Sequence, residues 1–167
     1  MSLDPFLAAS WQIQIHVVLA LIALILGPVA LWRKRRDRMH KMIGYIWVVS
    51  MTLASLVSFA IPSHFSPIGF GPIHLLSIYG LSGIYVAMRA IYRRDIRLHK
   101  EVMENLYVRG VALAGAFNFL PGRTTQRALL PDTPELGYVI IAAALIWAFL
   151  PMIMAALPKQ SYAKRDV

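Results

Sequence analysis

Much of the chain carries nearly the same pattern twice. In the first copy, Ile15-His16 precedes an apolar run of helix length that leads into the basic segment 35–41. In the second copy, Ile73-His74 precedes a similar run that leads into the basic segment 93–100. Each basic segment holds a further histidine, at nearly the same distance from the first one of its copy. Internal repeats constrain architecture strongly, and this one predicts a duplicated two-helix hairpin.

The apolar residues lie in long blocks, which predict transmembrane helices. They make up 58% of the 167 residues, and the mean hydropathy is +0.59, which a soluble domain of this size does not need. Each block has about the 20 residues that cross a hydrocarbon core, and lipid admits them only as helices. We expect an all-α membrane bundle with five spans: 11–32, about 42–61, about 73–92, a fourth from near His99 to Leu120, and 136–157.

The connecting segments alternate in charge and predict the orientation of the bundle. Basic residues crowd the first connection, the third connection and the C-terminal tail, whereas the loop 62–72 and the N-terminal tail have none. The positive-inside rule then places the N-terminus outside and the C-terminus in the cytoplasm. The start of the chain has no basic residue, so we expect no cleavable signal peptide. The predicted single domain covers 1–158 (repeat one 12–62, repeat two 70–121, fifth helix 136–157), and a basic cytoplasmic tail covers 159–167.

Four histidines fall on two levels of this predicted bundle. His16 and His74 lie near the outer ends of spans one and three, and His40 and His99 lie at the inner starts of spans two and four. The chain has no cysteine, which excludes thiolate metal sites and covalent c-type haem attachment. Facing helices can each supply one axial imidazole to a haem iron. The sequence therefore predicts two b-type haems, one per level, with the outer one favoured.

Each of these residues also has a structural interpretation. His40 and His99 lie in basic interfacial runs and could meet headgroups or water, and His74 could cap its helix. His16 is the hardest to dismiss because polar residues inside apolar spans are usually functional. His64 has no counterpart in the other copy, which indicates a loop residue or a minor partner at the outer site. Small residues beside the histidines, such as Ala23 and Gly27, could leave room for a porphyrin or could serve close helix packing.

Several arginines are candidates for binding haem propionates. Arg36 and Arg94 lie in the two basic segments, where topology signalling and anionic lipid also explain basic residues. Arg109 lies deep in the fourth span and needs a partner there, such as a carboxylate, a propionate or a water-filled cavity. Arg123 follows Pro121 and is either a propionate ligand or ordinary loop charge.

Two resemblances follow from these motifs. The repeated Ile-His, Gly27-Pro28, the Arg-Arg-Asp segments and the run 120–123 (Leu-Pro-Gly-Arg) resemble a bacterial family of predicted membrane proteins described as a domain of unknown function, over roughly residues 12–125. The four-histidine layout also resembles the cytochrome b561 group, in which four core helices hold two b haems. That resemblance implies that His16 and His74 bind the outer haem and that His40 and His99 bind the inner one.

We therefore expect a di-haem membrane cytochrome of the bacterial inner membrane, an oxidoreductase in the sense of electron transfer, with quinol or a similar reductant as donor. The alternative is a cofactor-free accessory or scaffold subunit of a larger membrane complex or homodimer. A small transporter ranks last, because the repeat is parallel and no broken helix pair is evident. Arginine runs without interleaved aromatic residues argue against nucleic-acid binding.

Overall fold

The computed structural model describes residues 3–62 and 69–156, with Ile153 the one side chain described after Leu150. Every regular element in this part of the chain is helical. Three helices, α2 (Trp11–Trp32), α3 (Arg38–Ser58) and α4 (Pro72–Tyr92), are long and apolar enough to cross a membrane. They coincide with the first three predicted spans.

The fourth and fifth predicted spans are also helical. Residues 96–117 form one continuous helical stretch built from α5 (Ile96–Asn105), the π-helix η1 (Leu106–Ala112) and α6 (Leu113–Phe117). After the short α7 (Thr124–Leu129), the chain continues into α8 (Glu135–Ala156). A short α1 (Asp4–Leu7) precedes α2 and packs against α7.

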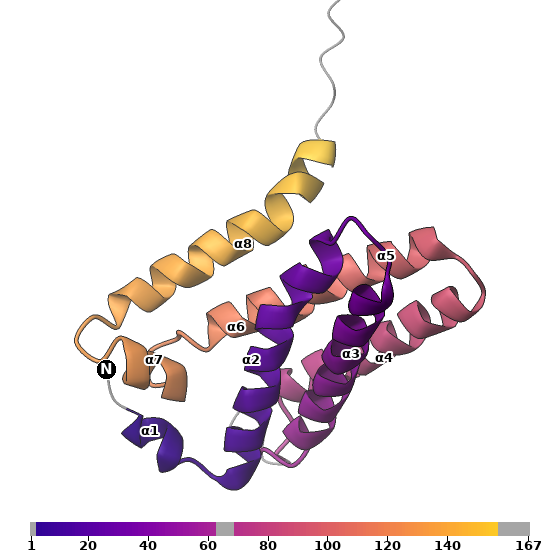
Figure 1. The fold of residues 1–167 in the computed structure, drawn as a ribbon. Helices are drawn as coiled ribbons and strands as arrows, with labels where there is room; N and C mark the ends of the chain where they lie inside the picture. Colours follow the sequence, from indigo (N-terminus) through magenta and orange to yellow (C-terminus); the bar gives the residue numbers. More distant parts are fainter. Residues whose placement is uncertain (1–2, 63–68, 157–167) are drawn as a thin grey trace, which may run out of the picture.

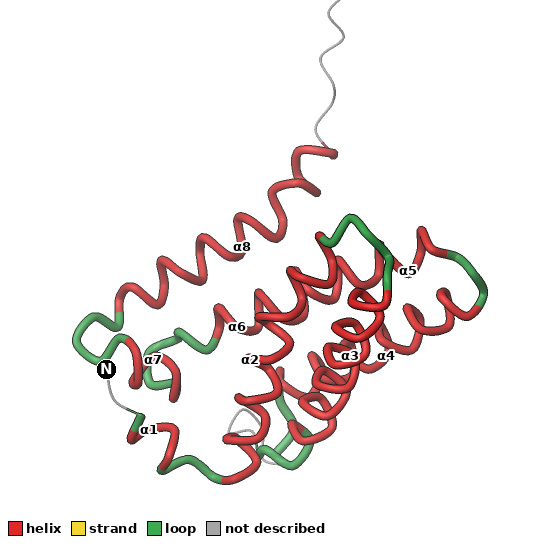
Figure 2. The backbone as a smooth tube through the Cα atoms, viewed as in Figure 1, coloured by secondary structure: helices red, strands yellow, loops and turns green. Residues whose placement is uncertain are grey.

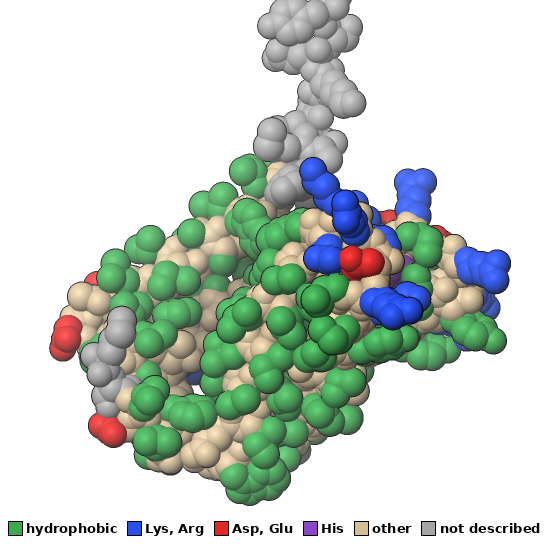
Figure 3. All heavy atoms as spheres, viewed as in Figure 1, with side chains coloured by type: hydrophobic (Ala, Val, Ile, Leu, Met, Phe, Trp, Pro, Cys, Tyr) green, Lys and Arg blue, Asp and Glu red, His purple; other side chains and the backbone are tan. Residues whose placement is uncertain are grey.

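The helices form two adjacent hairpins, α2–α3 and α4–α5, with α8 lying along α6 (Figures 1 and 2). The turns of both hairpins lie at one end of the bundle, where lysine and arginine side chains gather (Figure 3). We call this end, with the turns 33–37 and 93–95, the basic end. The segments α1 and α7 lie at the opposite end (Figure 1). The gathering of basic side chains at one end agrees with the alternation of basic and non-basic connecting segments in the sequence.

At the basic end, an aspartate caps the start of the helix that follows each turn. The Asp37 carboxylate accepts from the backbone N–H of His40 at 3.1 Å, and the Asp95 carboxylate accepts from that of Leu98 at 3.0 Å. Each aspartate thus satisfies one of the free N–H groups at the start of its helix. Arg94 has φ of 61°, and its N–H and that of Asp95 bond back to Ile91 and Ala90. This is the Schellman ending of α4, with arginine where glycine is usual.

The core is organised around a proline in α2. Pro28 has no N–H, so the carbonyl of Leu24 lacks its normal helical donor. The hydroxyl of Tyr107 donates to that carbonyl at 3.1 Å, and the indole of Trp47 donates to the neighbouring carbonyl of Ala23 at 2.9 Å. Both aromatic side chains are buried. Since lipid offers no donors, the bond from Tyr107 replaces the donor that Leu24 loses to Pro28.

The start of the π-helix wedges between α2 and α4 at two glycines. A Cβ on Gly27 would lie 2.3 Å from the ring of Tyr107, and one on Gly83 would lie 2.5 Å from the side chain of Leu106. Leu106 and Tyr107 are both buried. Gly27 and Ala23 therefore allow close packing of aromatic side chains. Of the two interpretations given for these small residues, room for a porphyrin and close packing, the structure favours close packing.

The last helix packs chiefly on α6 and η1. A Cβ on Gly137 would lie 2.0 Å from the carbonyl oxygen of Phe119, so α8 starts in close contact with the end of the fourth helical stretch. The short helix α7 lies in the segment between α6 and α8. It is fixed by the buried Gln126, whose amide bonds to the backbone of Gly122 and Leu130.

Candidate haem-binding site

The histidines at the basic end make equivalent contacts. The Nδ1 atom of His99 lies 2.9 Å from the carbonyl oxygen of Ala87, and that of His40 lies 3.2 Å from the carbonyl oxygen of Ala30. In each case the histidine at the start of one helix bonds to the preceding helix of its hairpin. Because a carbonyl can only accept, Nδ1 must carry the proton. The Nε2 atoms then keep their lone pairs, which is the tautomer that a metal-ligating imidazole needs.

Both imidazoles lie at the basic end of the bundle, within range of a weak electrostatic interaction with each other. Both are partly buried. Next to His40 on α3, a Cβ on Gly44 would meet no atom within 4 Å. The basic end thus offers two imidazoles of suitable tautomer and space beside one of them.

His40 has a second neighbour, the guanidinium of Arg36, with Nη1 at 3.4 Å from Nδ1. Arginine can only donate, so this contact and the bond to Ala30 require opposite protonation of Nδ1. The carbonyl contact is the shorter one. It also satisfies a carbonyl in the last turn of α2, which has no N–H donor within the helix.

The histidines at the opposite end differ from each other. His16 resembles the inner pair, since its Nδ1 lies 2.9 Å from the carbonyl oxygen of Ala54 on α3. In His74, by contrast, Nδ1 accepts from the backbone N–H of Gly71 at 3.0 Å. A neutral His74 therefore carries its proton on Nε2, which leaves no lone pair there for iron. This bond makes His74 a cap of α4, as one interpretation of the sequence expected.

The surroundings of His74 are closely packed. The side chain is only 4% exposed, with the ring of Phe70 stacked on it at 4.7 Å and that of Phe59 at 5.7 Å. The neighbouring hydroxyls of Ser58 and Ser77 contact each other and join α3 to α4. His64, the suggested minor partner, lies outside the described residues.

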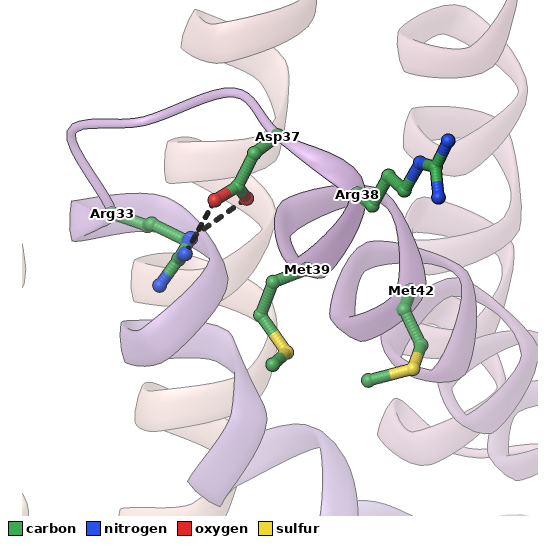
Figure 4. Close-up of a pocket in the computed structure, with 5 residues that line it drawn as sticks. All are labelled: Arg33, Asp37, Arg38, Met39 and Met42. Atoms are coloured by element: carbon green, nitrogen blue, oxygen red, sulfur yellow. Dashed lines mark hydrogen bonds and ion pairs between the residues drawn. The ribbon is translucent and has the colours of Figure 1, made fainter.

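Asp37 orders the turn beside His40. Its carboxylate forms an ion pair of 2.6 Å with Arg33, and in Figure 4 the two face each other while Arg38 points away. The hydrogen bonds from Arg33 and from the backbone N–H of His40 hold the pKa of this carboxyl well below its usual range. The carboxylate therefore accepts from the backbone of His40 and not from its imidazole.

The arginines proposed to bind propionates are dispersed. Arg36 and Arg94 are exposed at the basic end, and Arg123 is exposed at the opposite end, where it precedes α7. Arg109 lies on the π-helix, with its guanidinium carbon 5.8 Å from the centre of the Phe149 ring. Of these, Arg36 is the one in contact with a candidate histidine.

Three or more His, Asp or Glu side chains do not cluster into a possible metal site anywhere in the described residues. A bis-histidine haem needs only two protein ligands, so the haem prediction stays open. Sequence reasoning missed the tautomers of the histidines and the bond between Tyr107 and the Pro28 turn. Pro28 was the signal for the second, because a proline inside a span always leaves a carbonyl to be satisfied.

Comparison with known families gives one assignment. A family model described as "Predicted membrane protein (DUF2306)" matches residues 13–155. Neither the curated proteins nor the solved structures give a match, so the resemblance to the cytochrome b561 group remains an expectation. The chain is a member of the DUF2306 family of predicted membrane proteins.

Proposed function

We propose that the chain is a five-span membrane protein that carries electrons through a b-type haem held by His40 and His99. The carrying observation is that both imidazoles donate Nδ1–H to a backbone carbonyl and keep Nε2 for a ligand. Two such groups on adjacent hairpins are what a low-spin haem iron takes as axial ligands. The bound haem would supply a one-electron carrier, and the protein would set its position and surroundings.

The proposal includes the orientation of the bundle. The helical stretch 96–117 and α8 are the fourth and fifth spans, and the basic end faces the cytoplasm. His40 and His99 then lie on the cytoplasmic side of the inner membrane. Arg36, next to His40, is the arginine best placed for a propionate.

We propose one haem per chain. His74 does not fit a ligand role in its present hydrogen bonding, because its Nε2 carries the proton. No electron step is therefore assigned to the pair His16 and His74. The sequence favoured a haem at the end of the bundle that holds His16 and His74. A haem there would require the Nδ1 of His74 to give up its hydrogen bond from Gly71.

The alternative is a cofactor-free accessory subunit, and one observation favours it. The same histidine bonds have structural value, since His40 satisfies the end of α2 and His74 caps α4. In that case the histidines fasten helices to one another and bind no metal. The structural role of His99 is the weakest, because the carbonyl of Ala87 lies within α4 and already has its own helical donor.

The experiment is the optical spectrum of the protein purified from cells supplied with haem precursor. We expect sharp reduced-minus-oxidised bands of a b-type haem, with pyridine haemochrome giving about one haem per chain. A folded but colourless protein would favour the accessory subunit. Two haems per chain would instead restore the original di-haem prediction.

A further inference from the structure

A groove opens between α4 and the fourth helical stretch, and no motif of the sequence explained it. Its volume is about 270 Å³. It is lined from α4 by Tyr79, Ser82, Gly83 and Val86, and from α5 and η1 by Val102, Asn105, Leu106 and Arg109. We propose that this groove binds the ring of a membrane quinone, an inference that rests on the proposed electron-transfer function and names its donor site.

The groove lies at mid-membrane depth. Tyr79 and Val86 are each about 10 Å from the nearer end of α4, at 1.5 Å of rise per residue. Val86 is 40% exposed and Tyr79 is 39% exposed, although both belong to an apolar helix that can span the membrane. A ligand therefore reaches the groove from the hydrocarbon region, where the isoprenoid tail of a quinone is soluble.

Polar side chains in the groove suit the oxygens of such a ring. Both Arg109 and Asn105 line the groove. The guanidinium of Arg109 carries donors, and the amide of Asn105, whose nitrogen donates to the carbonyl of Glu101 at 3.0 Å, also carries an acceptor oxygen. The apolar sides of the groove come from Val86, Val102 and Leu106. Few polar groups in an apolar groove are typical of sites for small apolar ligands.

The backbone beside the groove is unusual in the same place. Asn105 ends α5, and Leu106 and Arg109 belong to the π-helix. Short π-helical segments within α-helices occur frequently at functional sites. The ring of Phe149, 5.8 Å from the guanidinium carbon, holds Arg109 from the side of α8. The π-helix and α8 together therefore place this arginine at the groove.

A phospholipid headgroup is the competing source of oxygen acceptors. Its phosphate lies at the polar boundary, about 15 Å from the bilayer centre, whereas the groove lies in the central part of α4. Depth therefore favours the quinone ring over the phosphate.

The test is photolabelling with an azidoquinone that carries a decyl tail, on the full chain in phosphatidylcholine nanodiscs. We expect the label in peptides of α4 and η1 and its displacement by decylubiquinone. Val86→Trp fills the groove, and Arg109→Gln removes the donors, so each variant should lose at least ten-fold of the displaceable label. The matched controls are Ile78→Trp, also on the exposed face of α4, and Arg89→Gln, whose guanidinium bonds to Tyr85. Both control variants should keep the displaceable label.

Equal labelling of Val86→Trp and Ile78→Trp would overturn the inference even if Arg109→Gln failed to fold. Displacement of the label by phosphatidylglycerol, but not by decylubiquinone, would also overturn the inference. Haem content, measured on the same samples, separates this inference from the proposed function. A colourless protein that is labelled in the groove would support the quinone site and contradict the proposed cytochrome function. A protein that contains haem but is not labelled in the groove would support the cytochrome function and contradict the quinone site.

Discussion

Single side chains in this bundle satisfy backbone groups that the sequence leaves open. Tyr107 donates to the carbonyl that Pro28 deprives of its donor, and Asp37 accepts from the first turn of α3. His40 and His99 donate to carbonyls of the helix before them. For Tyr107, which lies within the bundle, such a bond matters because lipid supplies no water to replace it.

The bond from Tyr107 to Leu24 is testable by a double-mutant cycle. Tyr107→Phe removes the donor and should lower the free energy of unfolding by about 1 kcal/mol. In a Pro28→Ala background the new N–H supplies Leu24, so the same substitution should cost clearly less. The measurement is unfolding by SDS titration in mixed micelles. Equal costs in the two backgrounds would mean that Tyr107 does not compensate for the proline.

Asp37 gives a prediction for pH. Its folded-state pKa is depressed by Arg33 and by the backbone N–H of His40, so its stabilisation is fully present above the unfolded-state pKa of about 4. That stabilisation is lost as the pH falls through the folded-state pKa. Asp37→Asn keeps a cap but cannot titrate. Thermal stability measured from pH 7 to pH 3 should therefore fall more in the wild type than in Asp37→Asn, and parallel curves would contradict this.

At the level of elements, the turns and the π-helix set how the hairpins meet. Both hairpin turns use an aspartate cap, and Leu106 and Tyr107 press into glycines of α4 and α2. The α4–α5 turn has a non-glycine residue in the left-handed region, at Arg94. These local features carry two predictions.

Replacing Arg94 by glycine should stabilise the protein. At φ of 61° an arginine is strained, and glycine relieves about 1 kcal/mol. Arg93→Gly is the matched control, because its φ of −81° suits any residue and glycine there only adds freedom to the unfolded chain. The melting temperature in detergent should rise for Arg94→Gly and not for Arg93→Gly. A fall for both would show that the side chain of Arg94 has an essential contact.

The close packing of the first π-helical residues on α2 and α4 predicts which glycines cannot be replaced without a loss of stability. Gly27→Ala and Gly83→Ala force Tyr107 and Leu106 to move and should each cost about 1–3 kcal/mol. Gly44→Ala and Gly115→Ala meet no atom within 4 Å and should be neutral or slightly stabilising. The thermal midpoint of the four variants in one detergent checks this. A tolerated Gly27→Ala would contradict the packing at α2.

The helical segments were predictable from hydropathy, but their details were not. The spans predicted at 11–32 and 73–92 match α2 and α4 within one residue, because their apolar blocks end in polar turns. The apolar pattern of the fourth stretch does not indicate the π-helix, whose first residues, Leu106 and Tyr107, pack on other helices. The histidine levels were likewise predictable from spacing, whereas the tautomers depend on which backbone group each ring meets.

For the molecule as a whole, one arrangement connects the basic end, the candidate haem ligands and the groove. The two hairpins place His40 and His99 at the basic end, and the groove beside Arg109 lies farther along the second hairpin. An electron given up by a quinol in this groove, as the quinol is oxidised, would then pass toward the basic end. In the proposed five-span topology, that end is cytoplasmic.

The most direct test of this account is the haem content of four single variants compared with the wild type. His40→Ala and His99→Ala each remove one proposed axial ligand and should abolish the low-spin b-type spectrum, which imidazole should restore to His99→Gly. His74→Ala removes a cap of α4 and should keep about one haem per chain. Loss of haem from His74→Ala together with retention in His99→Ala would place the cofactor at the other end of the bundle and contradict the account.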